Sequence, residues 1–352
     1  MKSMNILLVV FFAITSSNAF AINKRYFRDI TPKQLLNEIN FGYNLGNTME
    51  SKDKSLFNTP EYDVTAETRW GNVKTHEGIF TTLMDNKFNI FRIPTTWSGH
   101  FDEAPDYKIH DVWMKRVREI VDYAYNNGAY VILNTQHETW MDTYYHNYEN
   151  AKNITEKLWT QIAEEFKDYD EHLIFESFNE PRMGGSPVEW KGGNEEGRDV
   201  VNKLNNDFVK IVRKTGGNNS KQGNDKVIAD IHAYLPYDFA LNPGPGFNTY
   251  FTEEGQEVLD LCLERIKERF FDNNEPVILG EFGCQHRNNL EERIRWTEYY
   301  VRQATALGIR QLWWDNGIIK REGERLGLLD QIIDDEIDEN ENIEKVDSQF
   351  ED

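Results

Sequence analysis

Two glutamates, Glu180 and Glu281, stand at the ends of short apolar segments of the chain. Glu180 closes the segment that starts at Leu173, and Glu281 closes the segment that starts at Pro276. If both segments are strands that end at one mouth of a sheet, their carboxyl groups share a cavity. A close pair of carboxylates is the requirement for glycoside cleavage, in which one protonates the leaving oxygen and the other attacks the anomeric carbon. A single strand-end Glu would more simply pair with an Arg, so the prediction depends on there being two.

Several further side chains at strand ends fit this chemistry. Arg92 could keep the nucleophile ionised through charge-assisted hydrogen bonds, the alternative being a structural salt bridge. Asn179 could bond a sugar hydroxyl, and Trp314 could stack on a sugar ring unless it is part of the core. His232 and Tyr234 are two residues apart on a strand, so both could point into the same mouth.

Polar and aromatic residues near the same ends complete the candidate site. Asn44 lies at the C-terminal end of the first apolar segment, where it could support the pair. Trp97, Trp140 and Trp190 lie in or near the predicted loops and could extend a sugar-binding platform.

The elements that must position these residues alternate along the chain. Seven compact apolar segments predict strands of a parallel sheet that is covered on both faces: Phe41–Leu45, Asn89–Ile93, Ala129–Leu133, Leu173–Phe178, Lys226–Ile231, Pro276–Gly280 and Ile309–Trp314. Helical patterns such as Val112–Tyr125 separate them. Repeated strand–helix units predict a (β/α) barrel, with an open doubly wound sheet as the alternative. No Gly-rich nucleotide-binding motif follows the first strand, which favours the barrel.

The amino-acid composition limits the kinds of molecule that the protein is expected to bind. The chain has 352 residues with 39 Lys and Arg against 60 Asp and Glu, a net charge of −21. This field repels phosphate, which excludes nucleic acid and anionic membranes as favoured partners. With only Cys262 and Cys284, neither a disulfide scaffold nor a four-thiolate zinc site is expected. A neutral or polar ligand bound by a monomer is the expectation.

The two ends of the chain differ in composition from the segment between them. Residues 1–21 combine Lys2, an apolar run and a small-residue pair at Ala19 and Ala21, the layout of a secretory signal peptide. The apolar run is too short to span a bilayer, so we expect a secreted, extracellular protein. Residues 331–352 are strongly acidic and lack the loop pattern of a calcium site, which indicates a solvated tail. The barrel domain is therefore expected over residues 22–330.

At this point the motifs resemble those of glycoside hydrolase family 5, and most closely its subfamily 4 endoglucanases of anaerobic gut microbes. The motifs occur in the family's order between about residues 29 and 330: Phe41–Thr48, Phe91–Pro94, Phe178–Arg182, Ile231–Tyr234, Leu279–Gly283 and Trp313–Gly317. The resemblance implies a TIM (β/α)8 barrel, no metal or other cofactor, and retaining hydrolysis of internal β-1,4 bonds in cellulose-type glucans. It also implies Glu180 as acid/base, Glu281 as nucleophile, and Arg92, Asn179, His232, Tyr234 and Trp314 as their supports.

The sequence departs from the family pattern after the third strand. The family has His-His-Glu there, whereas this chain has Gln136, His137 and Glu138. Gln136 would take the place of the first His in the site, where it can form hydrogen bonds but cannot titrate.

Two further departures concern the scaffold. The helix predicted through Leu204–Val212 ends at Gly216 and Gly217, and only nine residues, 218–226, lead from there to the next strand. A crossover alone needs roughly ten or more. The family's fifth strand is therefore expected to be missing, which would bring Glu180 and Glu281 onto closer strands unless the sheet leaves a gap. The acidic tail also predicts a degenerate C-terminal helix.

Two functions from different classes remain open from the sequence. One is an active endo-β-1,4-glucanase, with xyloglucan, lichenan and mannan as alternative substrates. The other is a catalytically impaired or inactive relative that binds glucan on a damaged barrel.

Overall fold

The computed structural model describes residues 27–215, 217, 226–320 and 323–329. The predicted signal peptide, the acidic tail and the C-terminal helix lie outside these residues and stay predictions. Within the described residues, none of the helices combines the length and the apolar character that a bilayer crossing needs.

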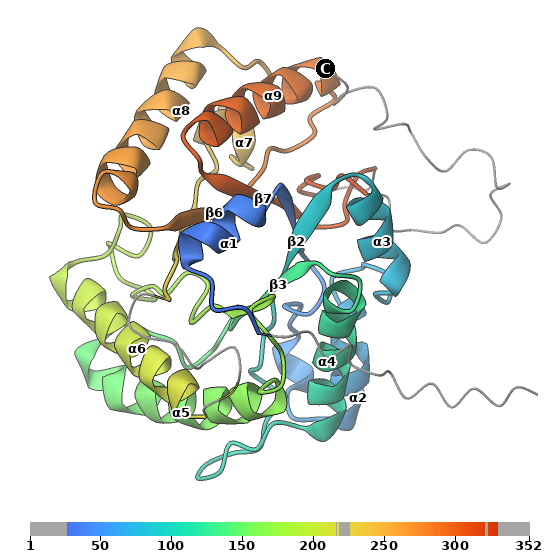
Figure 1. Ribbon diagram of the computed structural model, residues 1–352, viewed down its shortest axis with the longest axis vertical. Coiled ribbons are helices and arrows are strands. Elements are labelled where there is room, and N and C mark those ends of the chain that lie inside the picture. The colour runs from blue at the N-terminus through green and yellow to red at the C-terminus, as the bar shows by residue number, and fades with distance from the viewer. Residues whose placement is uncertain (1–26, 216, 218–225, 321–322, 330–352) are drawn as a thin grey trace, which may run out of the picture.

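A curled sheet of seven parallel strands forms the centre of the molecule (Figure 1). The strand order is β4-β3-β2-β1-β7-β6-β5, as in a TIM-type barrel, and every pairing is parallel. The strand bounds are β1 Phe41–Leu45, β2 Phe88–Ile93, β3 Tyr130–Leu133, β4 Leu173–Phe175, β5 Ala229–His232, β6 Val277–Phe282 and β7 Arg310–Asp315. Since β4 and β5 each pair on one side only among the described residues, they form the two edges of the sheet.

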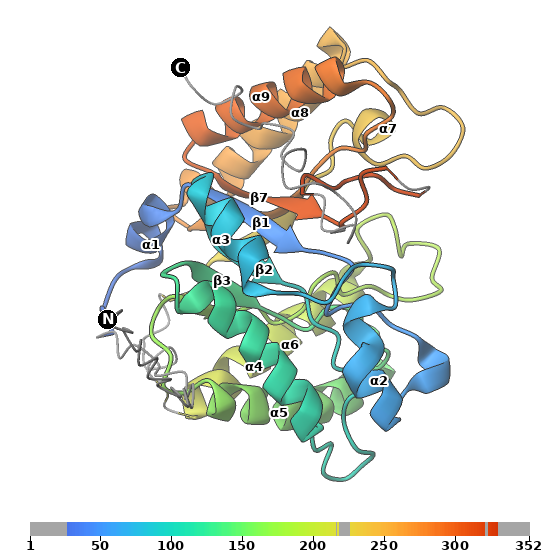
Figure 2. The ribbon, with the colours of Figure 1, turned by 90° about the vertical axis from the view of Figure 1, so that its right-hand side faces the viewer.

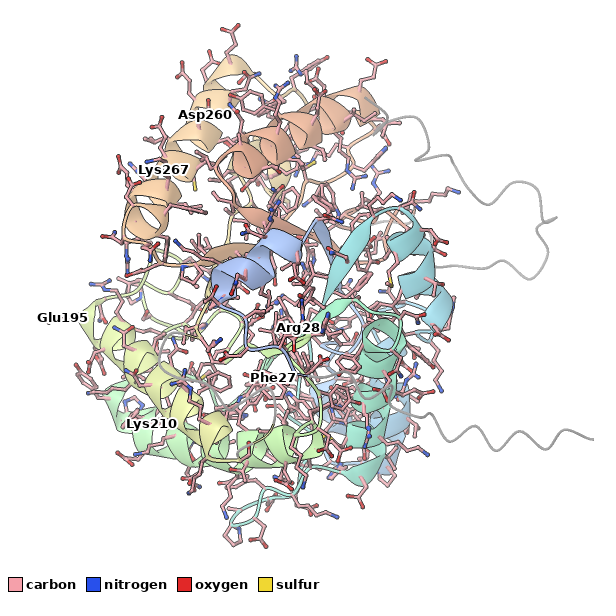
Figure 3. All side chains as sticks on the ribbon, viewed as in Figure 1. Phe27, Arg28, Glu195, Lys210, Asp260 and Lys267 are labelled. Atoms are coloured by element: carbon pink, nitrogen blue, oxygen red, sulfur yellow. The ribbon has the colours of Figure 1, made fainter. Side chains whose placement is uncertain are left out.

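Helices surround the sheet and cover its outer face (Figure 1). Their bounds are α1 Pro32–Glu38, α2 Pro60–Thr65, α3 Glu77–Asp85, α4 Asp111–Tyr125, α5 Tyr148–Glu165, α6 Glu195–Lys214, α7 Tyr237–Ala240, α8 Glu253–Ile266 and α9 Leu290–Ala306. Figure 3 shows charged side chains on the outward faces of α6 and of the segment around α8, where Glu195, Lys210 and Lys267 are exposed.

The period of two along each strand separates an outward and an inward set of side chains. Outward residues such as Phe91, Val131 and Leu279 join the cores beneath the helices. Inward residues form an apolar layer at the amino ends of the strands: Ile90, Ile132, Ile278 and Leu312. Leu35, Leu36 and Ile39, on and just after α1, pack against this layer, so α1 closes that end of the sheet, as the side view in Figure 2 shows.

Two residues further along the same strands the inward layer becomes polar. Asn44, Arg92 and Asn134 follow Gly42, Ile90 and Ile132 at this spacing and are all fully buried. The sequence therefore builds an apolar plug at one end of the sheet and a polar chamber at the other, where the strands end.

The structure shortens one predicted strand and extends another. β4 ends at Phe175 rather than Phe178, and β6 runs to Phe282, so that Glu281 lies inside the strand instead of after it. The seven apolar segments all contain strands. The absence of a fifth family strand stays a prediction, because residues 216 and 218–225 lie outside the description.

Candidate active site

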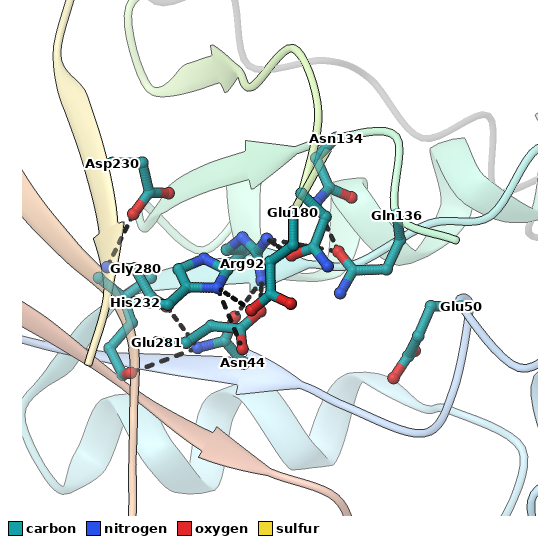
Figure 4. A network of polar contacts seen from close by, with 12 residues as sticks. Asn44, Glu50, Arg92, Asn134, Gln136, Glu180, Asp230, His232, Gly280 and Glu281 are labelled. Carbon is teal, nitrogen blue, oxygen red and sulfur yellow. Dashed lines mark hydrogen bonds and ion pairs between the residues drawn. The ribbon is translucent and has the colours of Figure 1, made fainter. Parts of the chain in front are cut away.

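Arg92 is the centre of the polar chamber (Figure 4). Its fully buried guanidinium donates to both carboxylate oxygens of Glu176, from Nε at 2.6 Å and from Nη2 at 2.8 Å. Nη1 donates to Glu281 Oε1 at 2.6 Å and to Asn44 Oδ1 at 3.0 Å. Burial alone would lower the pKa of Arg92, but the charges of Glu176 and Glu281 outweigh it and raise the pKa well above its usual value. Arg92 is therefore a permanent cation that binds two carboxylates at once.

The remaining acceptors of Arg92 come from loops after the strands. Nη2 donates to Asn179 Oδ1 at 2.9 Å and to Gln136 Oε1 at 3.3 Å. Asn44, on β1, also donates from Nδ2 to the carbonyl oxygen of Gly280 at 2.8 Å. The side-chain amides of Asn44 and Asn179 thus orient the guanidinium. Asn44 is fully buried, too deep to touch a ligand itself.

A break in the strand register turns Glu281 toward this chamber. The pairing of β6 with β7 shifts between Leu279 and Phe282, and both of these side chains point into the outer core. Because one extra residue lies between them, Gly280 and Glu281 both face the inner side of the sheet. Bulges commonly redirect side chains in this way next to active sites. A Cβ at Gly280 would lie 2.1 Å from Asp230 Oδ1, which accepts the Gly280 N–H at 2.9 Å, so any larger residue here would displace this carboxylate.

Glu281 is held from two directions. Besides Arg92 on Oε1, Tyr234 donates its hydroxyl hydrogen to Oε2 at 2.9 Å. Burial, followed by the Glu281 charge, raises the pKa of Tyr234 well above its usual value, so the phenol stays a donor. Both Glu281 oxygens are accordingly occupied, which fixes the carboxylate plane.

Glu180 lies opposite Glu281, with His232 between them (Figure 4). His232 Nδ1 is 2.8 Å from Glu180 Oε1 and 3.5 Å from Glu281 Oε2. One oxygen of Glu180, one of Glu281 and a ring nitrogen of His232 all lie within 4.8 Å of one another. This upper limit is compatible with the spacing of about 5–5.5 Å between the carboxyl groups of retaining glycosidases, and it is shorter than the roughly 6.5–9.5 Å of inverting ones.

The charges of this group are coupled. Burial alone would lower the pKa of His232, but the charge of Glu281 and the hydrogen bond to Glu180 raise it to about 9. The hydrogen bond from His232 in turn lowers the pKa of Glu180, against the effect of burial. Protonated His232 has no free lone pair, so the cluster is better suited to hold a proton than a metal ion.

Gln136 and His137 take the positions at which the sequence departs from the family. Gln136 Oε1 accepts from Asn134 Nδ2 at 2.6 Å as well as from Arg92, which leaves Nε2 as a donor beside the cleft. Burial, and then the Lys52 charge, lowers the pKa of His137 to about 4, so its imidazole is neutral.

A cavity of about 150 Å³ opens beside Glu180. Its lining includes Lys52, Gln136, His137, Asn179 and Arg182. Glu180 lines this cavity, whereas Glu281 is not among its lining residues.

The tryptophans occupy different environments from one another. Trp97 is fully buried and Trp140 is 8% exposed, so within the described residues neither ring forms part of an open platform. Trp140 instead donates from Nε1 to Glu138 Oε2 at 3.0 Å. Trp314 is half-buried on the inward side of β7, and Trp190 is 74% exposed.

Sequence reasoning missed the second carboxylate that Arg92 binds. Glu176 interrupts the otherwise apolar segment from Leu173, two residues after the inward Ile174. Burial alone would raise the pKa of Glu176, but the charge of Arg92 holds it below its usual value. A charged residue inside the predicted apolar segment Leu173–Phe178 was the available signal.

Comparison with known proteins assigns the family. Residues 50–221 and 218–319 match the family described as Cellulase (glycosyl hydrolase family 5). The chain belongs to glycosyl hydrolase family 5. This confirms the resemblance found in the motifs, and the chain is a glycoside hydrolase of the cellulase type.

Individual family 5 relatives cover nearly the whole chain. It is 46% identical to Endoglucanase B of Neocallimastix patriciarum over 94% of this chain and 73% of the relative. A GH5-4 broad specificity endoglucanase from Ruminococcus champanellensis, solved with bound cellotriose, is 38% identical with a TM-score of 0.84, over 87% of this chain and 95% of that one. XEG5A, a GH5 xyloglucan-specific endo-beta-1,4-glucanase from a metagenomic library, is 37% identical with a TM-score of 0.80, over 85% and 93% of the two chains.

Proposed function

We propose that this family 5 enzyme is a secreted, retaining endo-β-1,4-glucanase in which Glu281 is the nucleophile and Glu180 the acid/base. The observation that carries the proposal is the approach of the two carboxylates to within 4.8 Å, with both Glu281 oxygens held by donors. Its relatives named as endoglucanases support a β-glucan substrate.

In the first step Glu281 attacks the anomeric carbon while Glu180 gives its proton to the leaving oxygen. The bond between the anomeric carbon and that oxygen breaks, and a glycosyl ester on Glu281 forms. Arg92 and Tyr234 orient the attacking carboxylate during this step.

In the second step Glu180 takes a proton from water, which attacks the same carbon and releases Glu281 as a carboxylate. The hydrogen bonds from Arg92 and Tyr234 favour this regenerated anion. Esterification removes the negative charge of Glu281, the largest of the effects that raise the pKa of His232.

We also infer that, within the part of the chain that the structure describes, no strand lies between β4 and β5 in the sheet. The short connection in the sequence and the one-sided pairing of these two strands support this inference. The gap left in the sheet explains why Glu180 and Glu281 keep a retaining separation. Damage to the barrel therefore gives no reason to favour the inactive glucan-binding alternative.

The function is tested by reducing-sugar release from carboxymethyl-cellulose, xyloglucan, lichenan and mannan. We expect the wild type to be active and Glu281→Gln to be inactive. Glu180→Ala should lose activity on glucans, and azide should restore turnover of an aryl cellobioside because it attacks the glycosyl ester without a base. Glucan binding without turnover by the folded wild type would overturn the proposal.

A further inference from the structure

Arg182 lies between the acid/base Glu180 and an exposed aromatic ring. Its Nη1 donates to Glu180 Oε2 at 3.1 Å, the oxygen that His232 does not contact. The centre of its guanidinium lies 4.0 Å from the ring centroid of Trp190. The planar cation therefore stacks on the indole while it contacts the carboxylate.

The chain fixes both ends of this arrangement. The carbonyl oxygen of Arg182 accepts from Thr143 N at 3.1 Å, and Arg182 forms an isolated parallel bridge with Asp142. In the loop before Trp190, Glu189 accepts the Gly185 N–H at 2.9 Å, and its other oxygen is 3.8 Å from Arg182 Nε.

Apart from the long contact with Glu189, the indole of Trp190 is what keeps the guanidinium beside Glu180. The side chains of Arg182 and Glu180 are 34% and 38% exposed, and an exposed ion pair is weak because water competes for both partners. Stacking on Trp adds attraction and restricts the rotamers of the Arg. One face of Trp190 is consequently occupied by Arg182 rather than open to a sugar.

Charged and titratable groups surround Glu180 on every side. Besides Arg182 they are His232 and Tyr234 at β5, Glu281 on β6, Arg92 on β2, and His137 after β3. The cavity beside Glu180 is also lined by four further charged residues: Lys52, Glu138, Asp142 and Glu189. Arg182 differs from the other cations in this set because it alone is held by a ring outside the chamber.

We propose that Trp190 and Arg182 are positioning residues that set the pH range in which Glu180 can act as the acid. The proposal rests on the proposed function of Glu180. Arg182 stabilises the carboxylate form, which the second step needs, at the expense of the protonated form, which the first step needs. Trp190 sustains this effect by keeping the guanidinium in place.

The sign of the expected effect follows from the charge. The hydrogen bond from His232 is the largest cause that lowers the pKa of Glu180, burial opposes it, and the charges of His232 and then Arg182 lower the pKa further. Removing the Arg182 charge raises that pKa, so the protonated acid persists to higher pH. The alkaline limb of kcat/KM, which reports the acid in the free enzyme, must move upward.

The experiment measures pH profiles of kcat/KM on a cello-oligosaccharide, whose sugar leaving group needs the acid. We expect Arg182→Met to move the alkaline limb up by about half to one pH unit, at the lower end of the effect of a neighbouring Arg because the pair is part-exposed. Trp190→Ala should move it in the same direction by less, and Arg182→Lys should restore most of the wild-type profile. The acidic limb should not move.

A matched control is available on the same molecule. Arg287 stacks on the exposed ring of Phe247 at 4.6 Å, so Phe247→Ala removes a similar contact elsewhere and should leave both limbs unchanged. Unmoved limbs in active, folded Arg182→Met would overturn the inference. A higher KM with unmoved limbs in Trp190→Ala would instead show that the ring contacts sugar.

Failure of the inference can be told apart from failure of the proposed function. If Glu180→Ala loses activity and azide rescues it while the limbs of Arg182→Met stay in place, only the inference fails. If Glu180→Ala keeps full activity, the assignment of the acid/base fails and the inference falls with it.

Discussion

Tyr234 donates to Glu281 Oε2 at 2.9 Å, while Arg92 Nη1 donates to the opposite oxygen, Oε1, at 2.6 Å. Arg92 lies on β2 and Tyr234 follows β5, and together they leave the carboxylate no freedom to rotate. The neutral donor and the cationic donor can be separated by mutation, because the phenol contributes no charge.

Tyr234→Phe should slow the second step more than the first, because the hydrogen bond favours Glu281 as it leaves as a carboxylate. A hydrogen bond to a charged group contributes about 1.5–3 kcal/mol, which corresponds to a roughly 10- to 100-fold lower kcat. Rapid-quench measurements with an aryl cellobioside should show a burst of product followed by slow turnover. An unchanged kcat without a burst would contradict this role.

Glu176→Gln should destabilise the protein strongly, because it leaves the buried Arg92 with one carboxylate and turns an amide toward its N–H groups. Breaking a buried pair costs about 3–5 kcal/mol, to be measured as the free energy of unfolding in urea. The control Glu298→Gln removes an exposed ion pair with Arg302 at 3.5 Å and should cost about 1 kcal/mol at most. Equal losses of unfolding free energy in the two variants would contradict a stabilising role of the buried pair between Glu176 and Arg92.

Glu50 provides a pH-dependent contribution to stability. Burial raises its pKa to about 7, although its carboxylate accepts the N–H groups of Asn47 and Thr48. Because the folded pKa is above the unfolded one, the contribution is complete below the unfolded value of about 4.3 and is lost as the pH rises through 7.

Glu50→Gln removes this titration but turns one amide N–H₂ toward a backbone donor. We expect the variant to have a lower Tm than the wild type at pH 5 and a smaller difference at pH 8. Thermal unfolding of both proteins at the two pH values measures this. A difference that is equal at both, or larger at pH 8, would contradict a raised pKa.

Gln136→Leu tests the residue that replaces the family's His. The change removes an acceptor from Asn134 and Arg92 and a donor from the cleft. The loss of one hydrogen bond to substrate should lower kcat/KM by about 2- to 10-fold. Since an amide does not titrate, the shape of the pH profile should not change, and a shifted limb would show that Gln136 acts through the charge of Arg92.

The sequence was sufficient to predict the strands and the carboxylate pair, because buried parallel strands are visible as apolar segments and their polar ends share one edge. It was not sufficient to predict how Glu281 is aimed. The register break between Leu279 and Phe282 depends on the neighbouring strands and on the Asp230 carboxylate at Gly280, neither of which is adjacent in sequence.

The tryptophans show a second limit. Trp97 and Trp140 were predicted to extend a platform because they follow strands, yet both are buried around Glu138. The Glu138 carboxylate accepts the Trp97 N–H at 2.7 Å and the Trp140 Nε1–H at 3.0 Å. Position in a loop thus did not distinguish an exposed ring from one that closes over a buried acceptor.

The hydrogen bonds of Arg92 join groups from β1, β6 and the segments that follow β3 and β4. These segments are complete only when the first and last parts of the chain have come together, so a partly assembled sheet cannot orient Glu281. Recovery of glucanase activity after dilution from denaturant would consequently report the last stage of assembly, whereas helical circular dichroism would recover earlier. Activity therefore reports the completed fold, because it depends on the hydrogen bonds of one guanidinium group, that of Arg92.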